Sequence, residues 1–187
     1  MKRETDIAWL AGIVDGEGCI AFLRRTDYGK HRLEVRCDLK LAMADKETIL
    51  YCGDLVAEIV GDDGVRVFEE RRRVPRARPL WRTEVNSKRA VNELLQTLIP
   101  YLRTKKLEAL LALDYLSRST RSKHYHATDR DRLLADLATR LRNGCGEARI
   151  EGQALLDQVI PSQASEGQGS EEGVTTRGLS PNNNDPH

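Results

Sequence analysis

The clearest pattern in the sequence is an alternation of apolar and polar positions that begins at residue 33 and is strict to residue 41, with Met43 continuing the apolar series. Leucine, valine, cysteine and methionine occupy the odd positions, whereas Glu34, Arg36, Asp38 and Lys40 occupy even ones. A period of two is typical of a strand with one buried face. The sequence therefore predicts a half-buried strand whose open face carries charges of both signs, although an ordinary solvated sheet face has the same pattern.

Weaker patterns predict the remaining elements. Helices are expected over residues 7–16, 46–59 (capped by Asp45), 88–100, 104–116, 129–142 and 154–159, and strands over 19–25, 65–71 and 80–85. The last two strands are expected to pair as a hairpin. The order α-β-β-α-β-β-α, with C-terminal helices added, indicates an α+β fold in which helices cover one face of an antiparallel sheet.

The C-terminal segment differs in composition from the rest of the chain. Residues 161–187 are rich in Ser, Gly, Gln, Asn and Pro and contain few apolar side chains that could repay the entropy of ordering. We therefore predict one folded domain over residues 1–160 and a disordered tail over residues 161–187.

Composition excludes several classes of protein. No apolar run is long enough to span a bilayer, and the N-terminal residues do not resemble a signal peptide, so we expect an intracellular protein, cytoplasmic or nucleoid-associated, or organellar if organelle-encoded. The four cysteines lie far apart without metal-ligand spacing, which predicts reduced thiols.

Charge is unevenly distributed along the chain. The whole sequence has 30 basic and 29 acidic residues, but residues 1–160 have 29 and 25. Residues 64–90 contain nine Lys or Arg against three Glu. This local excess favours a polyanionic partner such as nucleic acid, while a solvated basic loop remains the alternative.

A short motif near the N-terminus carries the most specific signal. Small residues leave one side of the helix over residues 7–16 almost bare, so it can pack closely against another helix, and the helix ends in carboxylates that suit Mg²⁺. Residues 10–18, LAGIVDGEG, resemble the signature of the LAGLIDADG homing endonucleases, with five of nine positions identical. With PYLRTKK at 100–106 and the order of elements, the resemblance covers about residues 5–116. It implies an αββαββα fold whose sheet forms a DNA-binding saddle.

The resemblance also implies an active site. Glu17 is expected to bind Mg²⁺, with Mn²⁺ as a substitute, and Gly16 to contribute its carbonyl, whereas Asp15 has a structural role. Lys105, with Lys106 as the alternative, is the expected active-site lysine, which can stabilise charge on the phosphate. Asp45 is the expected participant in the water network.

Only one copy of the motif is present, so one chain supplies half of a two-metal site. The resemblance therefore implies a homodimer that binds a nearly palindromic duplex. The expected dimer interface is formed by Ala8, Leu10, Ala11 and Gly12. Expected base or phosphate contacts come from Arg25, Arg36, Asp38, Lys40, Arg66, Arg82 and Glu84.

Together these features predict an intron-encoded, Mg²⁺-dependent endonuclease that cuts both strands of a specific DNA site. Two other functions share the scaffold: an RNA-binding maturase that assists intron splicing without DNA cleavage, and a transcription regulator that binds DNA without nicking it. No membrane association is expected.

Overall fold

The computed structural model describes residues 4–27, 32–61, 64–70, 78–119 and 127–158. For residues 24–27 and 32–34 it describes the backbone alone. In chain order the elements are α1 (Glu4–Glu17), β1 (Gly18–Asp27), β2 (Arg32–Met43), α2 (Lys46–Val60), β3 (Val65–Glu70), β4 (Leu80–Val85), α3 (Lys88–Leu98), α4 (Lys106–Ser119), α5 (Asp129–Arg142) and α6 (Gly146–Asp157). This order confirms the predicted α+β arrangement.

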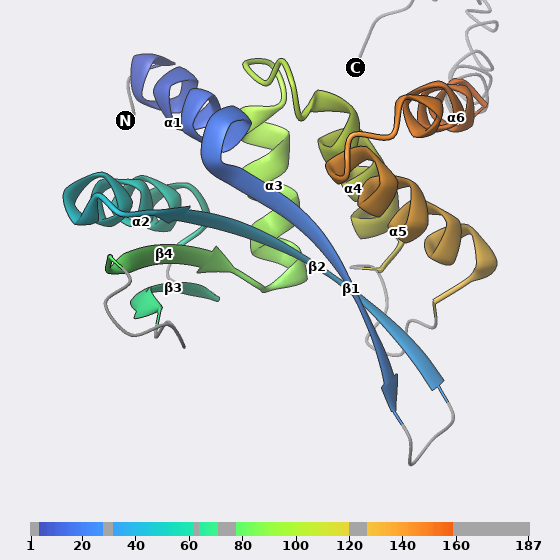
Figure 1. Cartoon of the computed structure of the whole chain (residues 1–187), viewed down its shortest axis with the longest axis horizontal. Helices are drawn as coiled ribbons and strands as arrows, with labels where there is room; N and C mark the ends of the chain where they lie inside the picture. The colour runs from blue at the N-terminus through green and yellow to red at the C-terminus, as the bar shows by residue number, and fades with distance from the viewer. Residues whose placement is uncertain (1–3, 28–31, 62–63, 71–77, 120–126, 159–187) are drawn as a thin grey trace, which may run out of the picture.

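The four strands form one antiparallel sheet in the order β1-β2-β4-β3. The predicted hairpin is present, since β3 and β4 pair directly. Strands β1 and β2 form a long hairpin that extends well beyond the two shorter strands (Figure 1). On β2 the side chains of Cys37, Leu39 and Leu41 are fully buried, which confirms the apolar face inferred from the alternation.

The buried face of the sheet packs against helices. Leu10, Ala11 and Val14 of α1 and the leucines of α3 lie in one core with four residues of β2, namely Val35, Cys37, Leu39 and Leu41. Helix α2 begins as predicted, because the Asp45 carboxylate accepts a hydrogen bond from the Thr48 backbone N–H at 3.0 Å. Helices α4 and α5 complete the core beside β1 and β2 (Figure 1).

The last helix differs from its prediction. Helix α6 starts at Gly146, eight residues before the expected start at 154. Its glycines weaken the helical signal in the sequence, but Ala148, Gly152 and Leu156 form a buried stripe. A Cβ atom at Gly152 would lie 3.5 Å from both Leu107 and Leu111 of α4. Packing against α4 therefore stabilises a helix that local propensity does not favour.

All four cysteines are free thiols. Within the described ranges, no helix has the length and apolar character needed to cross a membrane. The predicted tail over residues 161–187 lies outside the described residues.

Candidate functional site

The motif forms the junction between α1 and β1, which follow each other without a loop. A Cβ atom at Gly18 would lie 2.4 Å from the carbonyl oxygen of Val14 and 2.8 Å from its Cα. Because these are backbone atoms of a buried residue, only glycine allows the strand to leave the helix so closely. Glu17, the last residue of α1, is thereby held where the helix layer meets the sheet.

The Glu17 side chain is exposed at this junction. Among the described residues, the hydrogen bonds and ion pairs to carboxylates go to acidic residues other than Glu17. None of the described residues therefore neutralises the charge of Glu17. Gly16 is exposed too, and nothing lies within 4 Å of the position of its missing Cβ. The Glu17 carboxylate and the backbone at Gly16 are thus both exposed at the end of α1.

Asp15 connects the end of α1 to the segment that starts α4. Its two carboxylate oxygens accept hydrogen bonds from the backbone N–H of Arg103 at 2.6 Å and of Lys105 at 2.9 Å. Burial raises the pKa of Asp15, but the N–H donors of Lys105 and Arg103 and the contacts of Thr104 outweigh it, so the pKa lies below its usual value. Asp15 therefore has the structural role expected of the first acidic position.

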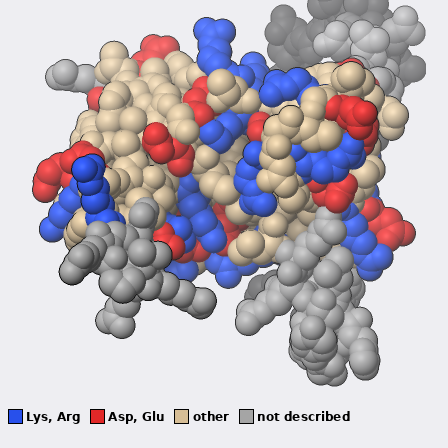
Figure 2. All heavy atoms as spheres, in the orientation of Figure 1, with Lys and Arg blue, Asp and Glu red and all other residues tan. Residues whose placement is uncertain are grey.

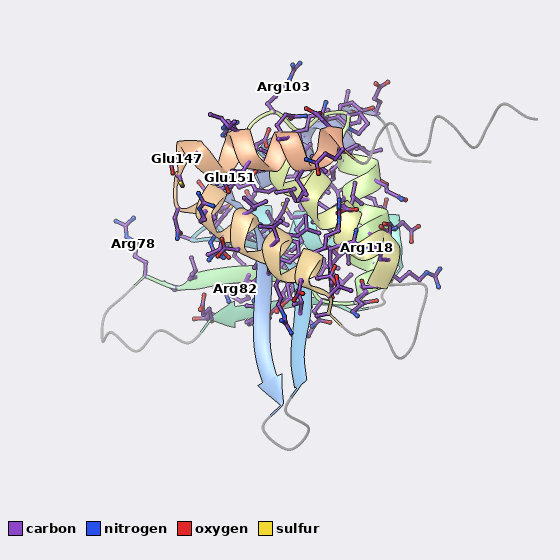
Figure 3. All side chains as sticks on the ribbon, turned by 90° about the vertical axis from the view of Figure 1, so that its right-hand side faces the viewer. Arg78, Arg82, Arg103, Arg118, Glu147 and Glu151 are labelled. Carbon is purple, nitrogen blue, oxygen red and sulfur yellow. The ribbon has the colours of Figure 1, made fainter. Side chains whose placement is uncertain are left out.

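Lys105 lies beside the motif. Its Nζ donates a hydrogen bond to the carbonyl oxygen of Asp15, and it lines a hollow of about 380 Å³ together with Gly18 and Cys19. Lys106 instead lines a separate hollow between α4 and α6. Arg103, two residues before Lys105, projects away from the sheet (Figure 3). The structure thus places Lys105, rather than Lys106, next to the end of α1.

Asp45 follows β2 at the same end of the sheet. Gly18 pairs with Leu41, and β2 ends two residues later at Met43. Asp45 is exposed and one of its oxygens, Oδ2, is engaged by Thr48. These bonds from the Thr48 side chain and backbone lower the pKa of Asp45. Asp45 is therefore ionised, with its Oδ1 not used in the cap.

The predicted DNA-contacting side chains share one face of the sheet. In the strand register Lys40 lies opposite Cys19 and Glu84, and Glu84 lies opposite Arg66. Because side chains alternate between faces, Arg36, Asp38 and Arg82 share this face as well. On the side of the molecule that Figure 2 shows, basic and acidic side chains are interspersed.

Burial separates the predicted contacts into two groups. Arg36 and Arg66 have side chains 42% and 59% exposed, whereas those of Asp38 and Glu84 are only 1% and 11% exposed. Neither acid is freely exposed to a base edge in a single chain, and direct contact of Asp38 and Glu84 with DNA stays a prediction. Neighbouring cations enclose both carboxylates.

The remaining predicted contacts have different environments. Arg82 forms an ion pair with Glu70 at 2.6 Å and lies on the sheet near β3 (Figure 3). The backbone of Arg25 pairs with that of Glu34 in β1, but its side chain lies outside the described residues.

Two exposed apolar residues on this face were not predicted as contacts from the sequence. Leu23 on β1 is 41% exposed and Phe68 on β3 is 36% exposed, and the register places them opposite Arg36 and Arg82. Apolar side chains can contact the methyl group of thymine. Both are apolar residues at strand positions that belong to the charged face. This exception to the alternation is the signal that could have identified them.

Known structures resemble this fold. The chain matches the homing endonuclease I-CvuI in complex with its target with a TM-score of 0.53 and 24% identity, covering 73% of this chain and 82% of that one. It matches the LAGLIDADG homing endonuclease I-GzeII in complex with its DNA target with a TM-score of 0.51 and 13% identity, covering 73% of this chain and 43% of that one. It matches the meganuclease I-SmaMI bound to uncleaveable DNA with a TM-score of 0.51 and 15% identity, covering 73% of this chain and 44% of that one. The chain has the LAGLIDADG homing endonuclease fold.

Sequence comparisons do not identify a family for this chain. Comparison with protein-family models and with curated proteins finds no match. The LAGLIDADG fold is therefore shown by the likeness to solved structures, and the chain spans less than half of I-GzeII and I-SmaMI.

The motif helix of this LAGLIDADG fold presents a different surface from the one predicted. Leu10 and Ala11 are fully buried in the core of their own chain, so their assignment to a dimer interface is wrong. Ala8 and Gly12, one helical turn apart, are exposed. Next to them Trp9 is 39% exposed and packs against Tyr51 of α2, with ring centroids 5.2 Å apart and the ring planes tilted by 56°.

The metal-binding capacity of a single chain is partial. Mg²⁺ prefers six oxygen ligands and commonly takes one or two carboxylates, with water and substrate phosphates completing the set. Within the part of the chain that is described, no three His, Cys, Asp or Glu side chains are grouped closely enough to hold an ion. Glu17 with the Gly16 carbonyl fits an ion that obtains its other ligands from outside the described residues.

Proposed function

We propose that this protein is a site-specific, Mg²⁺-dependent endonuclease that cuts both strands of duplex DNA as a homodimer. The observation that carries the proposal is the exposed Glu17 carboxylate at the end of the motif helix, with Lys105 held beside it through Asp15. The shared fold with I-CvuI in complex with its target, with I-GzeII in complex with a DNA target and with I-SmaMI bound to uncleaveable DNA supports DNA as the substrate.

In this mechanism each side chain has a distinct task. Bound Mg²⁺ supplies Lewis-acid activation of the phosphate and of a water molecule. Glu17 holds the ion, and the Lys105 ammonium provides positive charge where negative charge develops on the phosphate. Asp15 positions Lys105 by binding its backbone N–H. Asp45 orients water through the carboxylate oxygen that the helix cap leaves open.

The homodimer completes this site. One chain has one motif helix and one Glu17. The exposed stripe of Ala8 and Gly12, flanked by Trp9 and Tyr51, gives α1 an apolar outer side that a second copy can cover. The match to less than half of I-GzeII and I-SmaMI agrees with a chain that forms half of a complete enzyme.

A substitution at Gly12 tests the dimer. Nothing lies within 4 Å of a Cβ atom at this position in one chain, so Gly12→Leu should fold but prevent close approach of two α1 helices. We expect dimerisation to weaken about 10- to 100-fold, measured by sedimentation equilibrium with circular dichroism as the folding check. Gly146→Leu, at another exposed glycine with no Cβ neighbour, should remain dimeric. Equal dimerisation of both variants would contradict this interface.

Cleavage assays separate the proposed function from its alternatives. Purified protein is incubated with duplex DNA that joins the sequences flanking its reading frame, and with structured RNA, in Mg²⁺, in Mn²⁺ or in EDTA. We expect double-strand cuts at one site in Mg²⁺, slower or relaxed cutting in Mn²⁺, and none in EDTA. Tight RNA binding without cleavage would instead indicate the splicing function, and DNA binding without nicking would indicate a transcription regulator.

A further inference from the structure

Five charged side chains on the open face of the sheet form one continuous network. Asp38 accepts a hydrogen bond from Arg36 Nε at 2.6 Å and lies 3.5 Å from Lys40 Nζ. Lys40 is also 3.5 Å from Glu84, and Glu84 is 3.6 Å from Arg66. The network runs Arg36–Asp38–Lys40–Glu84–Arg66 and crosses β2, β4 and β3.

The network has a consistent arrangement of burial. Its two anions are enclosed, whereas Arg36, Lys40 and Arg66 have side chains 42%, 22% and 59% exposed. An enclosed carboxylate needs neighbouring cations to offset the loss of hydration, and long cationic side chains have many rotamers when nothing fixes them. The anions are therefore placed to fix the cations and not to contact a ligand.

Resting on the proposed function, we propose that Asp38 and Glu84 are positioning residues that determine DNA sequence preference through Arg36, Lys40 and Arg66. The carboxylates hold the cations in fixed directions, so that each cation reaches a particular base edge or phosphate. Because Lys40 contacts both acids, the three cations act as one unit. Preferences at the base pairs they contact are then coupled, and no base pair is read by Asp38 or Glu84 itself.

Asp38→Asn provides the first test. The substitution removes one negative charge and leaves the exposed cations solvated, so the fold should be retained. We expect binding to random-sequence DNA to tighten several-fold because the face gains net positive charge. The ratio of specific to random binding should fall, with preference relaxed at two or more base pairs in a binding selection. Relaxation at a single base pair would overturn the proposal, because it would mean that Asp38 reads that base itself.

A double-mutant cycle measures the coupling. Asp38→Asn, Lys40→Ala and their combination are compared for affinity to the preferred site, and we expect the combined effect to differ from the product of the single effects by about fivefold or more. Glu70→Gln is the matched control, since among the described residues Glu70 forms its ion pair with Arg82 on the same face and does not contact the network. Glu70→Gln and Lys40→Ala should be independent.

The outcomes distinguish two failures. One outcome is that the parent protein binds DNA while the combined variant changes the affinity by the product of the two single-variant changes. That result overturns the network proposal and leaves the endonuclease proposal standing. If the parent protein binds no DNA, both are overturned.

Discussion

Glu17→Gln is expected to abolish DNA cleavage and to leave DNA binding and the dimer intact. The amide has the same shape as the carboxylate but no charge with which to hold a divalent cation. Glu17 is exposed, so its replacement leaves no unpaired buried charge and should not alter stability. Loss of metal-dependent charge stabilisation should reduce single-turnover cleavage by about 10³-fold or more.

The measurement pairs single-turnover cleavage with a binding assay on the same DNA. Glu147→Gln, which neutralises an 86% exposed carboxylate on α6, is the matched control and should cleave at the parent rate. Undiminished cleavage by Glu17→Gln would show that another group holds the metal.

Asp15→Asn should have the second largest effect, on stability and cleavage together. The carboxylate accepts two short backbone hydrogen bonds that fix the start of α4 against the end of α1. An amide offers one acceptor and places an NH₂ group against the other N–H. We expect a loss of about 1–3 kcal/mol in the free energy of unfolding near neutral pH, measured by urea denaturation. Cleavage should fall as well, because Lys105 loses its positioning.

This loss of stability should depend on pH in a defined direction. Since the pKa of Asp15 is lowered in the folded protein, its ionised form contributes stability above the usual carboxyl pKa of about 3.9. That contribution disappears as the pH falls through the lower folded value. Parent and Asp15→Asn should therefore converge in stability as the pH falls below about 4.

Asp157→Asn serves as the control for this comparison. Asp157 is exposed at the end of α6 and accepts a hydrogen bond from Gln153 within the same helix, so its variant should follow the parent curve. A difference for Asp15→Asn that is constant across the pH range would contradict the role assigned to its charge.

Most of the fold could be predicted because its elements have strong local signals. The alternation over residues 33–43 marked β2, and Asp45 marked the start of α2. Helix α6 was placed too late because Gly146 and Gly152 lower helix propensity, and its stability comes from packing against Leu107 and Leu111. Such packing joins residues about forty positions apart, which no local pattern contains.

The candidate site shows the same division. Glu17, Gly16, Lys105 and Asp45 were identified from the motif and its spacing, and the structure brings Lys105 to the end of α1 through Asp15. Their chemistry stays a prediction. The sheet face and the outer side of α1 were assigned less well, because a strand or helix pattern indicates which residues share a face but not how far neighbours enclose each one.

The sequence by itself determined the order of the elements, the residues on the charged face and the motif that joins α1 to β1. These properties depend on contacts between residues close in the chain. Only the tertiary structure decided that Leu10 and Ala11 belong to the core of one chain and that Arg36 and Lys40 enclose Asp38. Burial is a property of the assembled layers, and it separates the charges that are open to a ligand from those that hold them in place.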